Sequence, residues 1–285
     1  MEIKTEEKKK PEISILMCVY NPTEEAQLRA AVCSMIQQTF SDWEMLLYDD
    51  GSDIVHQQMI QKAASMDPRI RYIRCEKNHG LAYGLNVCLE QTKGRYIARM
   101  DADDRSKPER LQKMYDFLEE HTEYGWVGSN TTLFDKMEVY GRREMPEVPK
   151  ATDFLKYSPY IHPSVVFRKS VLFCGGKYKN LHRGEDYELF MRLHAQGYQG
   201  YNLQELLFEY REDQNTYKHR KYRYQIEEVK IRLCGFKRMH ILNVTTFYYV
   251  IKPLLTGLVP DRILMKLKPH VRKEMYVERY AESKT

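Results

Sequence analysis

The stretch Met100-Asp101-Ala102-Asp103-Asp104 decides the fold class of this 285-residue chain. It ends the apolar segment 96–100, which Lys93-Gly94 separates from the preceding helix, so its acids stand at the C-terminal end of a predicted strand. Ligands of open α/β sheets bind at that edge. Crowded carboxylates repel one another, and Mg²⁺ or Mn²⁺ relieves the repulsion because these cations prefer oxygen ligands. The stretch therefore predicts a metal-assisted site, against the alternative of a solvated acidic turn before a helix at Pro108.

Short apolar runs alternate with amphipathic segments in front of these acids. Strands are predicted at 13–19, 43–48, 70–74 and 96–100, and helices at 24–36 after an N-cap at Thr23, at 55–66 and at 81–91. Such alternation builds βαβ units, so we expect an α/β fold with a mixed, mainly parallel sheet flanked by helices. The chain has neither a dinucleotide-binding glycine fingerprint nor a P-loop, which disfavours a dehydrogenase and a P-loop nucleotidase.

The charge of the chain is distributed unevenly. Residues 215–285 hold 16 Lys and Arg against 6 Asp and Glu, whereas the rest holds 29 against 34. A basic segment of this kind favours an anionic surface, such as a membrane, a nucleic acid or a phosphorylated acceptor. No nucleic-acid recognition motif accompanies it, so we expect no nucleic-acid partner.

The start of the chain and its cysteines indicate a cellular compartment. Residues 1–10 are mostly charged, which predicts a disordered tail, and they contain no apolar segment of a secretory signal. The six cysteines show no Cys-x-x-Cys spacing, and Cys18 and Cys88 lie among apolar residues. We therefore expect a reducing, cytoplasmic setting and no zinc site.

Six motifs in order give the chain a resemblance to the family 2 inverting glycosyltransferases. The motifs are 13–21 (ISILMCVYN), 37–44 (QQTFSDWE) with 49–52 (DDGS), 78–82 (NHGLA), 100–104 (MDADD) with Pro108, 162–168 (HPSVVFR) and 184–189 (GEDYEL). The resemblance extends from about Ile13 to about Tyr210 and implies the Rossmann-like GT-A fold. Cys18 departs from the family pattern, which more often has Pro, Thr or Ser there, and this affects only fine contacts with the donor.

The resemblance implies roles for the residues that bind the donor. Asp50 would hydrogen-bond the nucleotide base, and Tyr20 would line the base pocket. Asp103 would bind Mn²⁺ or Mg²⁺, and Asp101 would contact the ribose or a metal-bound water. His162 matches a histidine that contacts the metal or the diphosphate in some members, although a lone histidine is more often a plain polar partner.

The resemblance also implies the chemistry. Asp186 matches the catalytic base, and Glu185 would support it or touch the acceptor, although acids at a helix start are also favoured by the helix dipole alone. Attack by an acceptor hydroxyl with one base and no protein nucleophile inverts the anomeric carbon. The implied donor is a nucleotide-diphosphate sugar, most commonly UDP-linked in this family, and the implied acceptor is a glycan or a lipid-linked molecule. Asp104 is expected to cap the helix at Pro108.

The expected organisation has three parts. The tail (1–10) precedes a GT-A catalytic domain (11–214), and a basic helical extension (215–285) follows it. Within the catalytic domain, 11–104 would bind the nucleotide. Residues 105–214 would bind the acceptor, with shorter mixed strands in the irregular, proline-containing part from 125 to 160.

The extension contains an apolar, tyrosine-rich stretch at 239–259 with basic residues on both sides. Lys252-Pro253 interrupts it, so we expect an amphipathic helix that lies on an anionic membrane and does not cross it. This would make the protein peripheral on the inner face of the cell membrane. The alternative is a helix packed on the catalytic body or on a second subunit.

Two other functions belong to different classes. A sugar-nucleotide pyrophosphorylase also combines a parallel sheet with metal-binding acids, but its glycine-rich basic loop has no counterpart at 20–23 (YNPT). A non-catalytic sugar-nucleotide-binding module would have lost its acids, whereas Asp101, Asp103 and Asp186 are intact.

Overall fold

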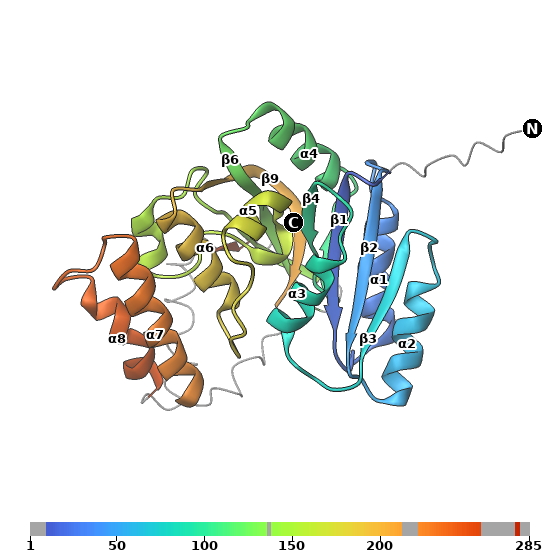
Figure 1. The fold of residues 1–285 in the computed structure, drawn as a ribbon, viewed down its shortest axis with the longest axis horizontal. Coiled ribbons are helices and arrows are strands. Elements are labelled where there is room, and N and C mark those ends of the chain that lie inside the picture. Colours follow the sequence, from blue (N-terminus) through green and yellow to red (C-terminus); the bar gives the residue numbers. More distant parts are fainter. Residues whose placement is uncertain (1–9, 136–137, 213–221, 258–276, 280–285) are drawn as a thin grey trace, which may run out of the picture.

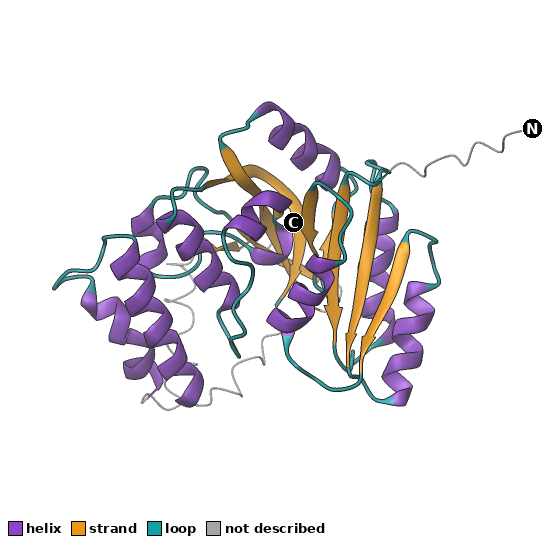
Figure 2. Cartoon of the chain, viewed as in Figure 1, coloured by secondary structure: helices purple, strands orange, loops and turns teal. Residues whose placement is uncertain are grey.

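Alternating strands and helices build the N-terminal half of the molecule, as the sequence predicts (Figures 1 and 2). The structure is a computed structural model, and it describes residues 10–135, 138–212, 222–257 and 277–279. The elements of this half are β1 (Ile13–Val19), α1 (Glu25–Ile36), β2 (Trp43–Asp50), α2 (Ile54–Ala64), β3 (Ile70–Cys75), α3 (Leu81–Glu90) and β4 (Tyr96–Arg99). β1 pairs in parallel with β2 and with β4, and β2 pairs in parallel with β3. These pairings confirm the predicted parallel sheet.

The second half extends this sheet with parallel and antiparallel strands, so the sheet is mixed as predicted. Its elements are β5 (Arg105–Ser106), α4 (Arg110–Glu120), β6 (Tyr124–Asp135), β7 (Glu138–Arg143), η1 (Ala151–Leu155), η2 (His162–Ser164), β8 (Val166–Arg168), α5 (Lys169–Cys174), α6 (Glu185–Ala195), β9 (Gln199–Arg211), α7 (Tyr222–Arg238), α8 (Phe247–Gly257) and β10 (Val277–Arg279). Within the described residues the order is β10-β7-β6-β8-β4-β1-β2-β3, and β9 pairs with β6 and β5. The expectation of shorter strands from 125 onward is wrong, because β6 has 12 residues and pairs with β7, β8 and β9.

Helices cover both faces of the sheet. One apolar core joins α1, α2 and α4 to side chains such as Ile15 of β1. The other core joins α3, α5, α6, α7 and α8 to side chains such as Leu16 of β1 and Trp126 of β6. Successive residues of a strand point to opposite faces, so a strand buried between two helical layers must be apolar at nearly every position. β1 meets this requirement at every position except Ser14, and all seven of its residues are buried or nearly so.

Two expected helix starts are wrong. α1 begins at Glu25, with Glu24 and not Thr23 at the N-cap position, and no side chain caps it. Asp104 does not cap the next helix, which begins at Arg110, because its carboxylate accepts a hydrogen bond from the backbone N–H of Arg211 at 2.7 Å. The short strand β5 instead follows the acids and pairs with β9.

The C-terminal helices α7 and α8 lie at the end of the molecule opposite α2 (Figure 1). Ile231 and Phe236 of α7 and Val250 of α8 are buried in the core that contains α6. Pro253 lies inside α8, so the expectation that it interrupts the helix is wrong; packing on α7 outweighs the single backbone hydrogen bond that proline removes. None of the helices in the described ranges is long and apolar enough to cross a membrane. Residues 258 and 259 of the expected stretch lie outside the described residues, as do residues 1–9 of the tail.

Replacing Phe236 with Ala should lower the free energy of unfolding by about 3–5 kcal/mol, because the substitution leaves a cavity where the ring is fully buried. Urea unfolding followed by circular dichroism would measure the loss. The matched control is Leu233→Ala on the same helix, where the side chain is 40% exposed, and the expected change there is within about 1 kcal/mol. Equal, small effects of the two substitutions would show that α7 does not belong to the core.

Candidate active site

Three parallel strands end at one edge of the sheet and carry the predicted donor-binding residues. Asp50 is the last residue of β2, Tyr20 follows β1, and Asp101 follows β4 after Met100. The strands are held in register there, since the backbone N–H of Met100 donates to the carbonyl of Leu16 at 3.1 Å. Tyr20 is half exposed, whereas Asp50 is buried. The structure thus brings together residues that lie up to 81 positions apart in the chain.

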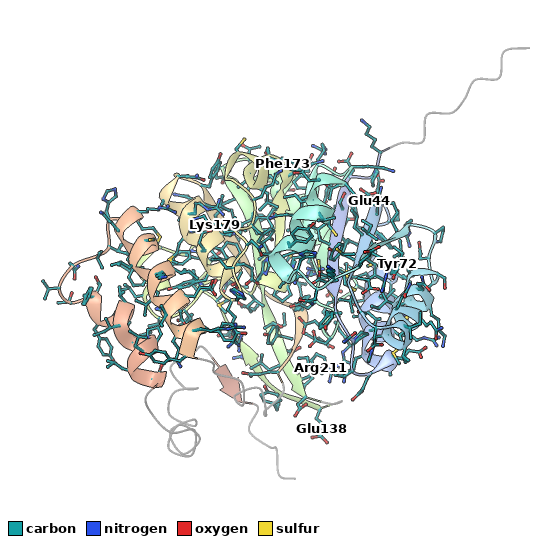
Figure 3. All side chains as sticks on the ribbon, turned by 60° about the horizontal axis from the view of Figure 1, so that its bottom comes forward. Glu44, Tyr72, Glu138, Phe173, Lys179 and Arg211 are labelled. Atoms are coloured by element: carbon teal, nitrogen blue, oxygen red, sulfur yellow. The ribbon has the colours of Figure 1, made fainter. Side chains whose placement is uncertain are left out.

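Asp49 and Asp50 at the end of β2 hold different partners. Asp49 is fully buried, and its carboxylate accepts hydrogen bonds from Tyr72 Oη (2.7 Å), Arg74 Nη1 (2.5 Å) and the backbone N–H of Ser52 (2.8 Å). Tyr72 lies on β3, beside β2 (Figure 3). Because all these bonds stay within the protein, we infer that Asp49 has a structural role. The sequence motif alone does not distinguish this role from that of Asp50.

Asp50 ties the end of β2 to the start of α3. Its carboxylate accepts from the backbone N–H groups of His79 (3.0 Å) and Gly80 (2.8 Å). Gly51 has φ +78°, and a Cβ there would lie 2.6 Å from the carbonyl carbon of Lys77, so only glycine fits. A carboxylate has about four acceptor positions, and the two N–H groups leave capacity for a further donor. The predicted contact of Asp50 with a nucleotide base stays a prediction.

The three acids of the stretch 101–104 have three different environments. Asp101 forms an ion pair with the buried Arg99, with Oδ1 2.5 Å from Nη2. The side chain of Asp104 is buried and bonded to the backbone of Arg211, which is labelled in Figure 3. Asp103 is exposed, and no other described residue donates a hydrogen bond to its carboxylate. Of the three, Asp103 is therefore the carboxylate that is available to an incoming cation.

Sequence reasoning missed Arg99. The sequence places it within a predicted apolar strand, yet its side chain is a buried cation, 1% exposed, next to the acids. A fully charged residue inside an otherwise apolar run, two positions before an acid, is the signal that could have identified it.

Glu185 and Asp186 begin α6, as expected, after Gly184 at φ +75°. Burial, together with the charge of Asp186, raises the pKa of Glu185 to about 7. Burial also raises the pKa of Asp186, whereas hydrogen bonds from backbone N–H groups at the helix start lower it in part. The charges of Asp101 and Arg99 act on both groups, so α6 presents this pair to the acids that follow β4. Carboxylates with raised pKa values are suited to accept a proton near neutral pH.

His162 is the first residue of η2 and is buried. Its Nε2 lies 2.9 Å from Tyr178 Oη, and burial together with the charge of Arg99 lowers its pKa well below the usual value. A neutral imidazole is the form that binds metals, but coordination through Nε2 would have to replace the bond to Tyr178. The metal role of His162 stays a prediction.

The acids after β4 fit a divalent cation that is shared with a substrate. Among the residues that the structure covers, no group of three or more His, Cys, Asp or Glu could hold an ion by itself. Mg²⁺ is usually bound by one or two carboxylates together with substrate phosphates, and a site of that kind needs no such group. Although Asp103 is exposed, loss of part of its surrounding water and the charge of Asp101 raise its pKa. A cation would relieve this unfavourable charge, so the residues fit the expected Mn²⁺ or Mg²⁺.

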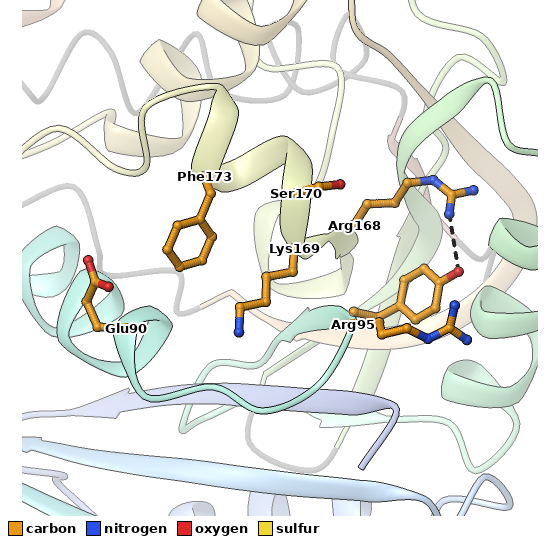
Figure 4. A pocket seen from close by; sticks show the side chains of 7 residues that line it. Glu90, Arg95, Arg168, Lys169, Ser170 and Phe173 are labelled. Carbon is orange, nitrogen blue, oxygen red and sulfur yellow. Dashed lines mark hydrogen bonds between the residues drawn. The ribbon is translucent and has the colours of Figure 1, made fainter. Parts of the chain in front are cut away.

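A cavity of about 680 Å³ lies elsewhere, at the N-terminal edge of the sheet (Figure 4). Arg95, Arg168 and Lys169 line it, and each already has a partner. Arg95 pairs with a glutamate, Arg168 donates to a tyrosine hydroxyl at 3.2 Å, and Lys169 donates to a backbone carbonyl at 2.7 Å. The cavity is therefore separate from the acids, and its three cations already have hydrogen-bond partners within the protein.

The mixed sheet, with acids at the ends of β2 and β4 and a second acidic pair at the start of α6, defines a glycosyltransferase of the GT-A class. The sequence model of "Glycosyl transferase family 2" matches residues 14–184, so the chain belongs to glycosyltransferase family 2 and is a sugar-transferring enzyme. The family assignment supports neither of the two alternative functions, a sugar-nucleotide pyrophosphorylase or a non-catalytic sugar-nucleotide-binding module.

Individual relatives agree with this assignment. The chain is 35% identical over 258 residues to "Putative glycosyltransferase EpsE" of Bacillus subtilis (strain 168), with 89% of this chain and 92% of EpsE covered. It is 27% identical to the UDP-Gal:alpha-D-GlcNAc-diphosphoundecaprenol beta-1,3-galactosyltransferase of Escherichia coli, with 88% and 92% covered. Among solved structures, S. aureus TarS 1-349 in complex with UDP-GlcNAc superposes with a TM-score of 0.67 at 16% identity, over 85% of this chain and 71% of TarS. This last likeness shows the fold alone.

Proposed function

We propose that this enzyme transfers a sugar from a UDP-sugar to a hydroxyl group of a glycan or lipid-linked acceptor, with inversion at the anomeric carbon. One observation carries the proposal: Asp103, which is exposed and receives no hydrogen bond from another described residue, and the pair Glu185 and Asp186 at the start of α6 all interact electrostatically with the same cation, Arg99. Asp103 suits the diphosphate end of a donor, and the pair Glu185 and Asp186 suits proton removal from an acceptor. The names of the relatives, which include a UDP-galactose-dependent enzyme acting on a lipid diphosphate and an amylovoran biosynthesis enzyme, support polysaccharide assembly as the setting.

We assign donor binding to residues 11–104 and acceptor binding to residues 105–214. Tyr20, half exposed beyond β1, supplies a ring against which a base can pack, and Asp50 retains acceptor capacity toward an N–H of the base. α6 belongs to the acceptor half and presents its acids across the sheet edge.

The acids after β4 hold and orient the diphosphate end of the donor. When bound there, Mn²⁺ or Mg²⁺ supplies positive charge that stabilises the departing diphosphate. Asp103 would be its protein ligand, while Asp101, fixed by Arg99, would direct its second oxygen to the ribose or to a metal-bound water.

Asp186 removes the proton of the acceptor hydroxyl as that oxygen attacks the anomeric carbon. The base and the leaving group then stand on opposite sides of the sugar, and no protein nucleophile is needed, which is why we propose inversion. Glu185, with a pKa of about 7, supports the charge of Asp186 or contacts the acceptor.

A screen of sugar nucleotides tests the donor. We expect a UDP-sugar to raise the melting temperature in Mn²⁺ more than the matching GDP- or dTDP-sugar does, and NMR of the transfer product to show the inverted anomer. A retained anomer, or stabilisation by another nucleotide alone, would contradict the corresponding part of the proposal.

We further propose that the outer face of α7 and α8 binds an anionic membrane surface. Exposed apolar side chains lie on α7 (Tyr222, Ile226 and Leu233), on α8 (Phe247, Tyr248 and Leu255) and on the loop between them (Val244). Lys230 and Lys237 lie exposed on the same part of α7. Apolar residues interspersed with cations suit the headgroup region, where each nearby Lys or Arg adds about 1 kcal/mol of attraction to anionic lipid.

Sedimentation with vesicles tests this surface. The full chain should co-sediment with phosphatidylglycerol-containing vesicles, less with phosphatidylcholine alone, and high salt should weaken the binding. The variant Phe247→Ser/Tyr248→Ser/Leu255→Ser should lose most of it. Substitutions are preferable to truncation after Asn215, which would remove Phe236 from the core.

The matched control for the vesicle experiment is Ile54→Ser/Val55→Ser. These residues are 65% and 56% exposed at the start of α2, at the far end of the molecule. The control should bind vesicles like the unaltered protein. Equal loss in both variants, or no binding by the full chain, would exclude the proposed surface.

A further inference from the structure

Arg99 is a buried cation with few partners. It ends β4, and its side chain is 1% exposed. Its guanidinium donates to Oδ1 of Asp101 at 2.5 Å, to the carbonyl of Met100, and to the carbonyl of Leu16 at 3.4 Å. Its Nε is buried and has no hydrogen-bond partner among the residues that the structure describes. Among the described residues, Asp101 is the one carboxylate to which Arg99 donates a hydrogen bond.

The ion pair with Arg99 restricts the orientation of the Asp101 carboxylate. The side chain of Asp101 is 33% exposed, so one side of its carboxylate is fixed against the protein and the other faces outward. A planar guanidinium anchored to two backbone carbonyls cannot follow a rotating carboxylate, which restricts Asp101 to the orientation that keeps the bond. Precise orientation of such a group contributes to affinity because less freedom is lost when the ligand binds.

We propose that Arg99 is a positioning residue for the donor. It holds Oδ1 of Asp101 inside the protein and thereby directs Oδ2 toward the nucleotide-sugar, leaving Asp103 as the carboxylate that carries the cation. The inference rests on the proposed function, because it specifies how the same site binds its donor. It assigns to Arg99 no contact with the donor itself, since the guanidinium is buried beneath Asp101.

Arg110 provides a matched comparison. It is another fully buried arginine, and it donates to Ser106 Oγ at 2.7 Å and to the carbonyl of Ser164 at 3.0 Å. None of its hydrogen bonds within the described residues goes to a carboxylate. The two arginines therefore share burial and backbone contacts and differ in the bond to Asp101.

A double-mutant cycle tests the inference. The variants are Arg99→Met, Asp101→Asn and the double variant, with UDP as the probe, titrated calorimetrically with and without MnCl₂. We expect each single substitution to weaken UDP binding in Mn²⁺ by roughly 10- to 100-fold, the range for loss of a hydrogen bond to a charged group. The double variant should bind no more weakly than Asp101→Asn, because Arg99 acts through Asp101. Arg99→Lys, which keeps the charge without the planar fork, should lie between the unaltered protein and Arg99→Met.

Melting temperatures give a second reading of the same cycle. Asp101→Asn leaves a buried cation without its counter-charge, so it should melt lower than the double variant, in which both charges are gone. Arg110→Met should lower the melting temperature yet leave the affinity for UDP within about twofold once folded.

The possible failures are distinguishable. If unaltered protein shows no Mn²⁺-dependent binding of UDP, the proposed function fails and the inference fails with it. If unaltered protein binds UDP but the effects of Arg99→Met and Asp101→Asn add, or Arg110→Met weakens binding as much as Arg99→Met, then Arg99 is merely structural and the inference alone is overturned.

Discussion

Replacing Asp103 with Asn should abolish sugar transfer, with a loss of at least roughly 10²-fold in kcat, while the protein stays folded. The carboxylate is exposed and receives no hydrogen bond from any other described residue, so the substitution disturbs no contact with the rest of the fold. It is also the group best placed to hold a cation against the diphosphate. Steady-state kinetics over a range of Mn²⁺ concentrations, together with thermal unfolding, would measure both effects.

Asp104→Asn is the control for that substitution. Asp104 is buried, and an asparagine oxygen can still accept the hydrogen bond from the backbone of Arg211. We expect this variant to respond to Mn²⁺ like the unaltered enzyme. Full activity of the unaltered enzyme in excess chelator would refute the metal-assisted mechanism.

Asp186→Asn should lower kcat by roughly 10²- to 10⁴-fold and leave donor binding nearly unchanged, because the lost group removes a proton and does not hold the diphosphate. Separate measurements of turnover and of UDP binding would show the split. Glu185→Gln is the matched control from the adjacent position and should retain more activity. If Asp186→Asn keeps near-normal kcat on the true acceptor, another residue is the base.

The pH dependence of this reaction follows from the same group. Burial raises the pKa of Asp186, so its protonated form persists to higher pH than that of an ordinary aspartate. Activity requires the carboxylate, and it should therefore be lost on the acid side, as pH falls through a value above the usual aspartate pKa of about 3.9. Since Glu185 has a pKa of about 7, it is uncharged while Asp186 titrates at lower pH, so Glu185→Gln should leave this acid limb where it is. A limb in kcat/KM that moves in this variant would show that Glu185 carries a charge while Asp186 titrates.

The N-terminal half of the fold could be predicted from the sequence because its signals are local. The strand predicted at 13–19 coincides with β1, and the strands predicted at 43–48 and 70–74 differ from β2 and β3 only at their ends. A strand covered by helices on both faces must be a continuous apolar run, and such a run is visible in the sequence. The acids follow these runs directly, so their position at the sheet edge was predictable as well.

Tertiary structure alone decided the rest, because the deciding contacts join residues far apart in the chain. β6 is long because three other strands pair with it, and α8 continues through Pro253 because α7 supports it. The sequence shows three similar acids between 101 and 104, but only the fold distinguishes them. Asp101 pairs with Arg99. Asp104 accepts a hydrogen bond from the backbone of Arg211, which lies more than 100 positions later in the chain. Asp103 faces the solvent. Local pattern reports which residues are buried, whereas the partner of a buried charge depends on how distant strands are brought together.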